Sequence, residues 1–585
     1  MIKKLARSIR QYKKATLLIP LFVTLEVIVE VIIPILMAKL IDYGIDAGDM
    51  NYVLKMGAAL FIAALISLLF GILAGRTSAV ASAGFAQNLR RDIFYNVQHF
   101  SFSNIDKFST ASIITRLTTD VTNVQNSFQM LTRMAMRSPV MLVFSLIVSF
   151  SIDPQLSLIF LVSIPILGVG LWLIMSNAHP VFERVFKTYD KLNNVVQENL
   201  RGMRVVKSFV REDYENDKFM DISNRIFKDF TKAERLVAMV MPLMQFCMYA
   251  CILLVSWFGA RAIVASGGNP VNGLSTGELL SLITYATQIL ISLMMLSMVF
   301  VMLTISRASA ERIVEILDEE SNLRNGLQPI FNLKDGEIRF ENVNFSYGKQ
   351  GDKLVLDQIN LTIKSGETIG VLGGTGSSKS TLVSLIPRLY DVTQGKVTVG
   401  GVDVRDYDIE TLRNGVAMVL QKNELFSGTI KDNLRWGNEL ATEEEMIHAC
   451  KLAQAHDFIE SFPEKYDTLI EQGGTNVSGG QKQRLCIARA LLKKPKILIL
   501  DDSTSAVDTK TDAQIRRALR VEIPGTTKII IAQRVSSVQD ADKIVVMDDG
   551  KIVAIGKHEG LLDSCPIYLE VFESQAKGGK NNGDE

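Results

Sequence analysis

Long apolar stretches recur along the first half of the chain, whereas short apolar runs alternate with polar segments in the second half. Four stretches nearly free of charge each approach or exceed the roughly 20 residues that a bilayer-spanning helix needs. They start near Leu54 or Gly57, Gln155, Leu236 and Leu279 and end near Gly75, His179, Ala260 and Ser306. Two further stretches, 15–41 and 138–152, are less regular, because the first contains two glutamates and the second is short unless its helix starts earlier. We therefore predict six transmembrane helices, with the third the least regular.

Basic residues give the orientation of these helices. The first 14 residues, MIKKLARSIRQYKK, carry six Lys or Arg and no acid, which places them on the cytoplasmic side of a cell membrane. They predict an amphipathic helix on the membrane surface. No small-residue cleavage site follows the apolar stretch, so we do not expect a signal peptide.

The connections between the predicted spans differ in length. Those near Asp46, Asp153 and Gly267 are short and poor in cations, so we expect them outside the cell. The segments 76–137 and 180–235 are long, charged and helix-like, so we expect cytoplasmic extensions of the membrane helices.

A second domain follows the membrane half. We expect the membrane domain over 1–310 and a linker over 311–335, helical at first and then polar. From Gly336 to about residue 575 apolar strands alternate with helical segments, the pattern of an α/β domain. The strand candidates are EIRFENVNF, ETIGVLG, KILILDD, KIIIAQ and KIVVMDDG. The last residues, 576–585, predict a disordered tail.

Composition narrows the interpretation only slightly. At 585 residues the chain has room for a membrane assembly and a soluble domain. A net charge of +1 says nothing about nucleic-acid or acidic partners, and we expect no nucleic acid. Five cysteines show no disulfide spacing. We interpret Cys247 and Cys251, four apart in an apolar stretch, as packing residues rather than metal ligands.

The clearest chemistry lies at GGTGSSKST, between a predicted strand and a predicted helix. In such a P-loop the backbone N–H groups surround phosphate oxygens, Lys379 reaches the β- and γ-phosphates of ATP, and Ser380 ligates Mg²⁺. The expected ATP-binding residues of the loop are Gly373, Gly374, Thr375, Gly376, Ser377, Ser378, Lys379, Ser380 and Thr381. Further along, the apolar strand in ILILDD ends at Asp501, which is placed to hold Mg²⁺ through water.

Further motifs follow in a fixed order, and together they resemble the ATP-binding cassette (ABC) transporters. NVSGGQKQRLCIARAL resembles the family's signature motif, while FENVNFSY, VLQKNELFSGTI and SAVD resemble its other nucleotide motifs. The resemblance implies that Tyr347 stacks on adenine and that Gln421 contacts Mg²⁺. It also implies residues that act on ATP held by a second cassette: Val477, Ser478, Gly479, Gly480, Gln481 and the D-loop Asp508.

The membrane half shares the resemblance. FSTASIITRLTTDV and ENLRGMRVVKSFVRED resemble the cytoplasmic loops of ABC exporters that carry coupling helices. Six spans followed by one cassette is the order of an exporter half-transporter, which implies a dimer as the working unit.

Three residues depart from the family pattern, and all surround the nucleotide held by this chain's own P-loop. Ser378 stands where the family has glycine, Asp502 where it has the catalytic Glu, and Gln533 where it has the switch His. Asp502 and Gln533 are therefore the candidate catalytic residues. The signature departs only mildly, with Val477 in place of Leu.

This asymmetry leads to a hypothesis of a heterodimer. This chain's own site would bind ATP and hydrolyse it slowly, and its signature would complete a competent site on a different half-transporter. The alternatives are a slow homodimeric exporter and an ATP-gated regulatory or channel-like membrane protein. A soluble P-loop ATPase acting on DNA is excluded by the spans, and an importer subunit is less consistent with the fused order. Drugs, lipids and peptides all remain open as substrates.

Two glutamates, Glu26 and Glu30, lie mid-span in the first stretch, four apart on one helical face. Carboxylates in a bilayer are costly and face a cavity or a partner charge. One interpretation is a translocation path that attracts cationic substrates. The other is a wet cavity or a basic partner with no role toward substrate.

Overall fold

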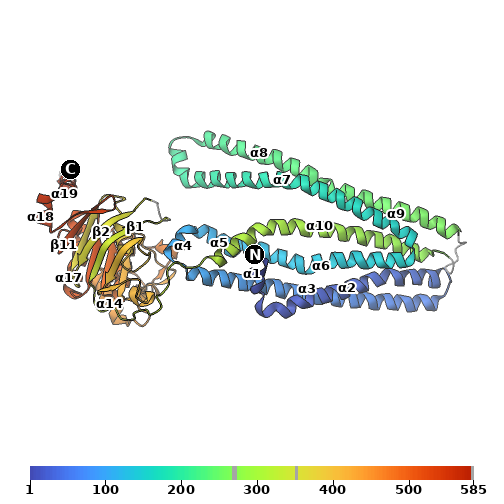
Figure 1. The fold of residues 1–585 in the computed structure, drawn as a ribbon, viewed down its shortest axis with the longest axis horizontal. Coiled ribbons are helices and arrows are strands. Elements are labelled where there is room, and N and C mark those ends of the chain that lie inside the picture. Colours follow the sequence, from blue (N-terminus) through green and yellow to red (C-terminus); the bar gives the residue numbers. More distant parts are fainter. Residues whose placement is uncertain (266–272, 349–352, 581–585) are drawn as a thin grey trace. The chain divides into compact units, whose positions relative to one another are not determined.

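The computed structural model describes residues 1–265, 273–348 and 353–580 (Figure 1). The expected outer connection near Gly267 lies outside the described residues. The chain forms two compact units: the first contains Met1–Gln98 and Thr110–Glu319, and the second contains His99–Ser109 and the chain from Glu320 onward. Each is described by itself below.

The described residues of the first unit form helices joined by short connections. Its α-helices are α1 (Ile2–Arg7), α2 (Lys13–Leu40), α3 (Met50–Gln98), α5 (Thr110–Thr115), α6 (Val121–Ile152), α7 (Pro154–Ser208), α8 (Glu212–Ala238), α9 (Val240–Ala265) and α10 (Thr276–Asp318). A 3-10 turn, η1 (Arg10–Tyr12), precedes α2, and π-helical turns η2 (Ile41–Ile45) and η3 (Arg116–Asp120) follow α2 and α5.

Within the described residues, six helical segments are long and apolar enough to span a membrane, which confirms the predicted number. They are Arg10–Ile45, Met50–Gln98, Thr110–Ile152, Pro154–Ser208, Glu212–Ala265 and Thr276–Asp318. The third starts well before residue 138, so its short apolar run is only the end of a longer helix. The segments 76–137 and 180–235 are helical along most of their length, as expected for extensions of the spans.

Local sequence explains where two of these helices begin. The Asp153 carboxylate accepts hydrogen bonds from the N–H groups of Gln155 and Leu156 (2.8 and 3.0 Å), and Pro154 occupies the first turn of α7. Ser275 and Glu278 form a capping box at the start of α10. Helix α10 runs to Asp318, so the first eight residues of the expected linker extend the last membrane helix.

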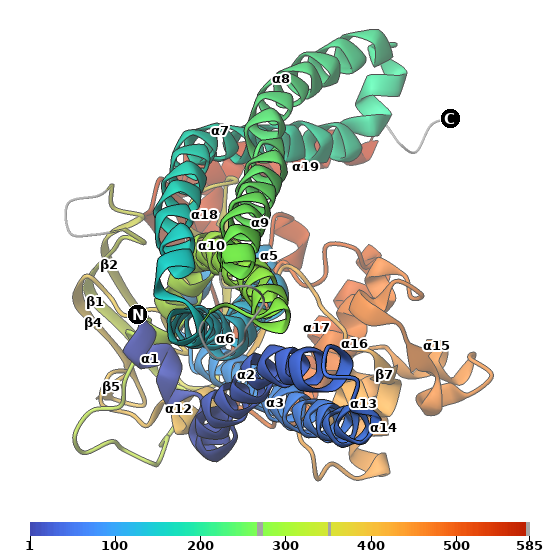
Figure 2. The same cartoon turned by 90° about the vertical axis from the view of Figure 1, so that its right-hand side faces the viewer.

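The helices of the first unit form two groups around a shared centre. In the end-on view of Figure 2, α6 and α10 lie between the α2–α3 pair and the α7–α9 pair. Tyr285 of α10 is fully buried there, and its hydroxyl donates to the Val31 carbonyl of α2 (2.6 Å). Helix α8 packs along α7 (Figure 1).

The N-terminal segment packs against α3. Ser8 and Arg10 donate to the Asp92 carboxylate at 2.8 and 2.7 Å, and Asn88 donates to the Ser8 carbonyl at 2.8 Å. Leu5 of the short helix α1 is buried. The location of α1 on a membrane surface stays a prediction.

The second unit is the expected α/β domain. Its strands are β1 (Ile338–Phe345), β2 (Leu356–Ile363), β3 (Thr368–Gly373), β4 (Gln394–Val399), β5 (Val402–Asp403), β6 (Val416–Val419), β7 (Gly428–Thr429), β8 (Leu469–Ile470), β9 (Ile497–Asp501), β10 (Thr527–Ile531), β11 (Lys543–Asp548) and β12 (Lys551–Gly556). The main sheet has the order β12-β11-β3-β10-β9-β6, and all its neighbours are parallel except β11 and β12. A four-stranded antiparallel sheet, β2-β1-β4-β5, and the β7–β8 pair complete the domain.

The helices of this unit are α4 (Phe102–Lys107), α11 (Lys379–Ser384), α12 (Ile409–Gly415), α13 (Ile430–Arg435), α14 (Glu443–Leu452), α15 (His456–Glu460), α16 (Gly479–Leu492), α17 (Thr509–Glu522), α18 (His558–Ser564) and α19 (Pro566–Lys580). The 3-10 turns are η4 (Lys465–Asp467), η5 (Gln472–Gly474) and η6 (Val535–Ser537). Helix α19 extends through residues 576–580, and the boundary and disorder expected for the tail, 576–585, stay predictions. Residues 581–585 lie outside the described part of the chain.

Helix α4 belongs to the second unit although its sequence interrupts the membrane half. The Tyr390 hydroxyl donates to the Asp106 carboxylate at 2.7 Å, and the Tyr390 ring meets the Phe102 ring edge-on at 6.0 Å. Asn104 donates to the Glu320 carbonyl at 3.1 Å. A short piece of the membrane-half sequence is therefore built into the cassette.

The parallel order of the main sheet positions the candidate site. Strands β3, β9 and β10 are neighbours, and they end at Gly373, Asp501 and Ile531. Ligands of open parallel sheets bind beyond the carboxyl ends of the strands. The P-loop, the Asp501–Asp502 pair and the loop that carries Gln533 therefore leave the sheet at one edge.

Candidate ATP site

The P-loop joins β3 to α11, and its backbone includes a left-handed conformation that glycine adopts most easily. Ser378 has φ +68° and ψ +23°, a left-handed conformation at the N-cap of α11. A non-glycine residue there costs on the order of 1 kcal/mol. Gly373 has no space for a side chain, since an added Cβ would lie 2.3 Å from the Met547 carbonyl oxygen. Glycine is thus required at Gly373, whereas Ser378 carries backbone strain because its φ is positive.

Lys379 folds back over this loop. Its Nζ donates to the carbonyls of Gly373 and Gly374 (2.9 and 2.7 Å) and to the Ser377 hydroxyl (3.1 Å). Burial lowers the pKa of the ammonium group, while the charges of Asp501 and Asp502 oppose that shift. When ATP binds, its phosphate oxygens would replace these loop carbonyls as the hydrogen-bond acceptors of the Lys379 ammonium group.

Asp501 and Asp502 lie side by side at the end of β9. Burial raises the pKa of the Asp501 carboxyl, and a hydrogen bond from Ser380 works against the rise. Burial likewise raises the pKa of Asp502, against a hydrogen bond from Gln421 and the Lys379 charge. Asp502 has φ +48°, and its N–H donates to the Ile531 carbonyl at 3.0 Å. This backbone hydrogen bond therefore fixes the position from which the Asp502 side chain extends.

Gln533 meets Asp502 directly. Its Nε2 donates to Asp502 Oδ2 at 3.0 Å. Two of the three departures from the family pattern thus contact each other in the folded chain.

The residues around these carboxylates fit a Mg²⁺ ion delivered with ATP. Ser380 reaches Asp501 and Gln421 reaches Asp502, so hydroxyl, amide and carboxylate oxygens meet at one place. Mg²⁺ prefers such oxygen ligands and keeps several water or phosphate ligands. No group of three or more His, Cys, Asp or Glu in the described chain could hold a metal, so an ion here would depend on phosphates as well.

Tyr347 lies beside the P-loop helix. Its hydroxyl and the Thr381 hydroxyl are 2.9 Å apart, and its ring meets the rings of Phe345 and Tyr390 edge-on at 4.9 and 5.1 Å. About half of the Tyr347 side chain is exposed. The aromatic platform predicted for adenine therefore has free surface, and Tyr390 links it to α4.

The signature motif begins α16. Ser478 and Gln481 form a capping box: the Ser478 N–H donates to Gln481 Oε1 at 2.9 Å, and Ser478 Oγ accepts from the Gln481 N–H at 3.3 Å. Gly479 and Gly480 open the helix, and a Cβ added to Gly480 would lie 2.8 Å from the Ala506 carbonyl oxygen. Ser478 and Gly479 are exposed, and Val477 packs against the core.

A buried glutamine joins the signature helix to the D-loop segment. Gln483 donates to the Ser505 hydroxyl (3.2 Å) and accepts from the Ala506 N–H (3.0 Å). Asp508 then caps α17 by accepting from the Thr511 N–H at 2.9 Å. The signature and Asp508 consequently form one connected edge.

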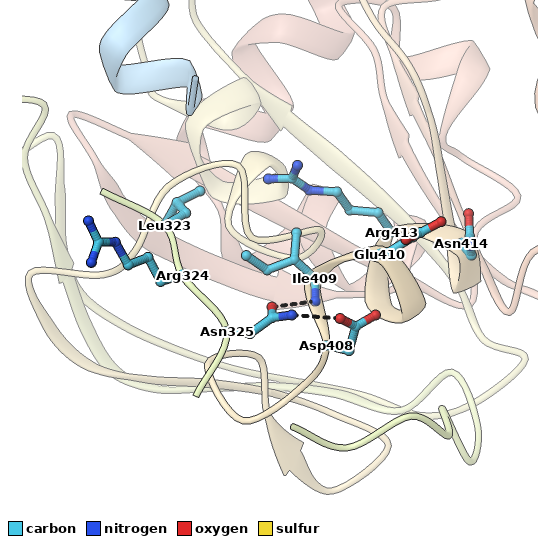
Figure 3. A pocket seen from close by; sticks show the side chains of 8 residues that line it. All are labelled: Leu323, Arg324, Asn325, Asp408, Ile409, Glu410, Arg413 and Asn414. Carbon is cyan, nitrogen blue, oxygen red and sulfur yellow. Dashed lines mark hydrogen bonds between the residues drawn. The ribbon is translucent and has the colours of Figure 1, made fainter. Parts of the chain in front are cut away.

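A hollow of about 550 Å³ lies elsewhere on the cassette, between the linker and the start of α12 (Figure 3). Asn325 donates to the Asp408 carboxylate (2.6 Å) and accepts from the Ile409 N–H (3.0 Å). None of the predicted ATP-site residues lines this hollow. These bonds fasten the linker to the cassette.

In the membrane unit, Glu26 and Glu30 share one basic partner. Arg137 of α6 donates to Glu26 Oε1 at 2.6 Å and to both Glu30 carboxylate oxygens at 2.8 and 2.7 Å. Glu26 is 7% exposed, and its Oε2 is buried without a hydrogen-bond partner in the described structure. The cluster of Glu26, Glu30 and Arg137, called the intramembrane charge cluster below, contains two carboxylates and one guanidinium.

Sequence reasoning did not find Arg137, Tyr390 or Gln483. Arg137 and Tyr390 lie in no motif, and Gln483 lies within the signature motif at a position to which the resemblance gave no role. Arg137 and Glu26 are 111 positions apart in the sequence. The one available signal was that two arginines, Arg133 and Arg137, directly precede an apolar run.

Comparison with known proteins gives the family. A model of the ABC transporter transmembrane region matches residues 16–294, and a model of the ABC transporter cassette matches residues 356–505. The chain is 38% identical over 538 residues to the uncharacterized ABC transporter ATP-binding protein YfiB of Bacillus subtilis, covering 92% of both chains. It is 32% identical over 532 residues to the ATP-dependent lipid A-core flippase of Syntrophus aciditrophicus, covering 90% of this chain and 85% of that protein.

A solved structure supports the fold. The structure of a bacterial Atm1-family ABC exporter with ATP bound matches with a TM-score of 0.81 at 24% identity, over 96% of this chain and 99% of that chain. The present chain belongs to the ABC transporters. It is an ATP-driven half-transporter, a multi-pass membrane protein with its membrane domain and cassette on the same chain.

Proposed function

We propose that this chain is one subunit of a heterodimeric exporter, and that its own ATP site binds ATP but hydrolyses it slowly. In this proposal its exposed signature edge completes a competent ATP site on the partner subunit. The observation that carries the proposal is the contact between Gln533 Nε2 and Asp502 Oδ2 at 3.0 Å.

Slow hydrolysis follows from the reach and orientation of Asp502. Aspartate is about one bond length shorter than the glutamate expected there, and a displacement of roughly 1 Å can lower a rate on the order of a hundredfold. A general base must lie within hydrogen-bond reach of the attacking water, so the shorter Asp502 side chain is a slow base even though Gln533 holds its orientation. Gln533 can donate a hydrogen bond to phosphate but cannot carry a positive charge at neutral pH.

ATP binding does not depend on the family residues that Ser378, Asp502 and Gln533 replace. Lys379 and Ser380 are present, Tyr347 offers free ring surface, and the strain at Ser378 is worth only about 1 kcal/mol. Mg²⁺ would be held by Ser380, Gln421 and, through water, Asp501.

The test compares turnover by this chain alone with turnover in the presence of a partner half-transporter that has the catalytic Glu and the switch His. We expect slow ATP hydrolysis alone and fast hydrolysis together. A matched control is Lys379→Ala, which removes phosphate binding at this site. Robust turnover by this chain as a homodimer would refute the heterodimer proposal.

For the transported substrate, we propose that the intramembrane charge cluster favours amphipathic cations, because two carboxylates face one guanidinium. The competing interpretation is a purely structural ion pair, and Arg137 is the basic partner that this interpretation requires. The flippase named above acts on a lipid, so lipids stay among the substrate classes together with drugs and peptides.

The charge cluster is tested by transport of a cationic dye and of a neutral dye by the Glu26→Gln/Glu30→Gln variant. We expect cation transport to fall severalfold and neutral transport to stay unchanged. Equal transport of the cation by the variant and the unsubstituted chain favours the structural ion pair.

A further inference from the structure

The C-terminal helix reaches the switch loop through one side chain. Gln575 of α19 donates from Nε2 to the Gln533 carbonyl at 2.8 Å, and its Oε1 accepts from the Val535 N–H at 2.9 Å. One amide thus spans the backbone on both sides of Arg534. We propose that Gln575 is a positioning residue for ATP hydrolysis, holding the switch loop so that residues 533 and 534 face Asp502.

The helix that presents Gln575 is firmly anchored. Tyr568 is fully buried, and its hydroxyl lies 2.7 Å from His558 Nδ1 of α18. Val571 and Phe572 pack against the main core, and Phe572 contacts the His558 ring at 5.4 Å. Positions 568, 571, 572 and 575 follow helical spacing and share one face. Gln575 is therefore the polar end of a packed apolar stripe.

The loop that Gln575 holds acts directly on Asp502, the candidate general base. The Gln533 side chain donates to Asp502 Oδ2, and the Arg534 charge acts to lower the pKa of Asp502 against the effect of burial. Val535 is buried, so this part of the loop has a fixed base. A shift of the loop backbone would move both groups away from Asp502 together.

The far end of the loop is held differently. The Ser537 hydroxyl donates to Asp512 of α17 at 3.0 Å, and Arg516 of α17 bonds both Asp512 and Asp540. Removing Gln575 thus frees the Gln533 carbonyl and the Val535 N–H, and the end held by α17 stays in place. This restricts the expected effect to the residues that face Asp502.

Glutamine suits this position because the loop offers one acceptor and one donor. A glutamate at 575 would accept from the Val535 N–H but would place a carboxylate oxygen against the Gln533 carbonyl. Gln575→Glu should therefore behave like Gln575→Ala, although it keeps the length of the side chain. Ser574→Ala, at the exposed neighbouring position on α19, is the matched control.

The experiment measures ATP hydrolysis by the full-length chain with radiolabelled ATP, in the unsubstituted sequence and in an Asp502→Glu background. We expect Gln575→Ala to lower kcat about tenfold, since small displacements of catalytic groups have effects of this order. KM for ATP should stay within about twofold, because the P-loop and Tyr347 are untouched. Gln533→Ala should act similarly, and the double variant should be no slower than either single variant.

Hydrogen exchange supplies the structural measurement. The segment 533–535 should exchange faster in both Gln575 variants, and 537–540 should not. Faster exchange with kcat unchanged would overturn the proposal, because the contact would then only fasten the loop. Multiplying effects in the Gln533→Ala/Gln575→Ala variant would also overturn it. A different result would refute the slow-site proposal, namely fast ATP turnover by the unsubstituted chain.

Discussion

The two nucleotide-handling regions of this cassette differ in how closely they follow the family pattern. The chain's own site has a strained Ser378, a short carboxylate at Asp502 and an amide at Gln533 bonded to that carboxylate. The signature edge has an intact capping box and a buried glutamine that ties it to the D-loop segment. The chain's own ATP site thus departs from the family pattern, whereas the signature edge, which would serve a second cassette, retains every expected polar group.

The largest effect is expected at the signature edge. Gly480→Ala would place a Cβ 2.8 Å from the Ala506 carbonyl oxygen and push the D-loop segment away from α16. In the complex with a catalytically complete partner, ATPase activity should fall on the order of a hundredfold, because the partner's ATP would lose aligned contacts. The control is Asp502→Asn in the same complex, which should change the rate less than threefold. Similar losses in both variants would erase the proposed difference between the two regions.

Restoring the family residues at the chain's own site should have an intermediate effect. Asp502→Glu combined with Gln533→His extends the carboxylate and replaces the neutral amide beside it with a group that can carry a positive charge. Turnover by the chain alone should rise about tenfold, less than the roughly hundredfold or more that a positioned general base contributes in full, because Asp502 already supplies a carboxylate. Steady-state hydrolysis with and without Lys379→Ala measures this gain. A rate unchanged by the double substitution would place the limitation outside this pair.

Relief of strain in the P-loop should have a smaller effect. Ser378→Gly removes a Cβ from a residue with φ +68°, so we expect ATP to bind up to about fivefold more tightly, equivalent to about 1 kcal/mol. Equilibrium binding of ATP at several Mg²⁺ concentrations measures this. Weaker binding in the glycine variant would mean that the serine hydroxyl itself contacts phosphate.

The smallest effect concerns acid stability. Burial holds the pKa of Asp502 above its ordinary value, so the folded chain binds a proton there more readily than the unfolded chain. The contribution of Asp502 to folding stability therefore falls as the pH rises from the unfolded pKa through the folded one. Asp502→Asn should remove this part of the pH dependence, which thermal unfolding from pH 4 to pH 7 measures. A steeper dependence in the variant would contradict the stated direction of the shift.

Much of this architecture could be predicted because its signals are local. Hydropathy located six spans, the period of apolar runs located the strands, and the P-loop motif located the loop between β3 and α11. Local signals were weaker at element ends: α10 continues to Asp318 and α19 to Lys580 because helix ends depend on caps and packing as well as composition.

The remaining features depend on contacts between distant residues. Arg137 meets Glu26 across 111 positions, and Gln575 meets Val535 across 40. Neither pairing has a spacing that a helix or a strand would enforce. The contact of Gln533 with Asp502 likewise requires β9 and β10 to be neighbours, which the sequence alone does not state.

The inclusion of residues 99–109 in the cassette unit limits how this protein can be recombined. A hybrid exporter joined at residue 319 would pair the foreign cassette with an unmatched α4, and the Tyr390–Asp106 hydrogen bond and the Phe102 ring contact would be lost. Transplanting α4 together with the cassette would preserve both. Gene shuffling among such exporters should therefore favour exchanges that move two separated stretches of the gene at once.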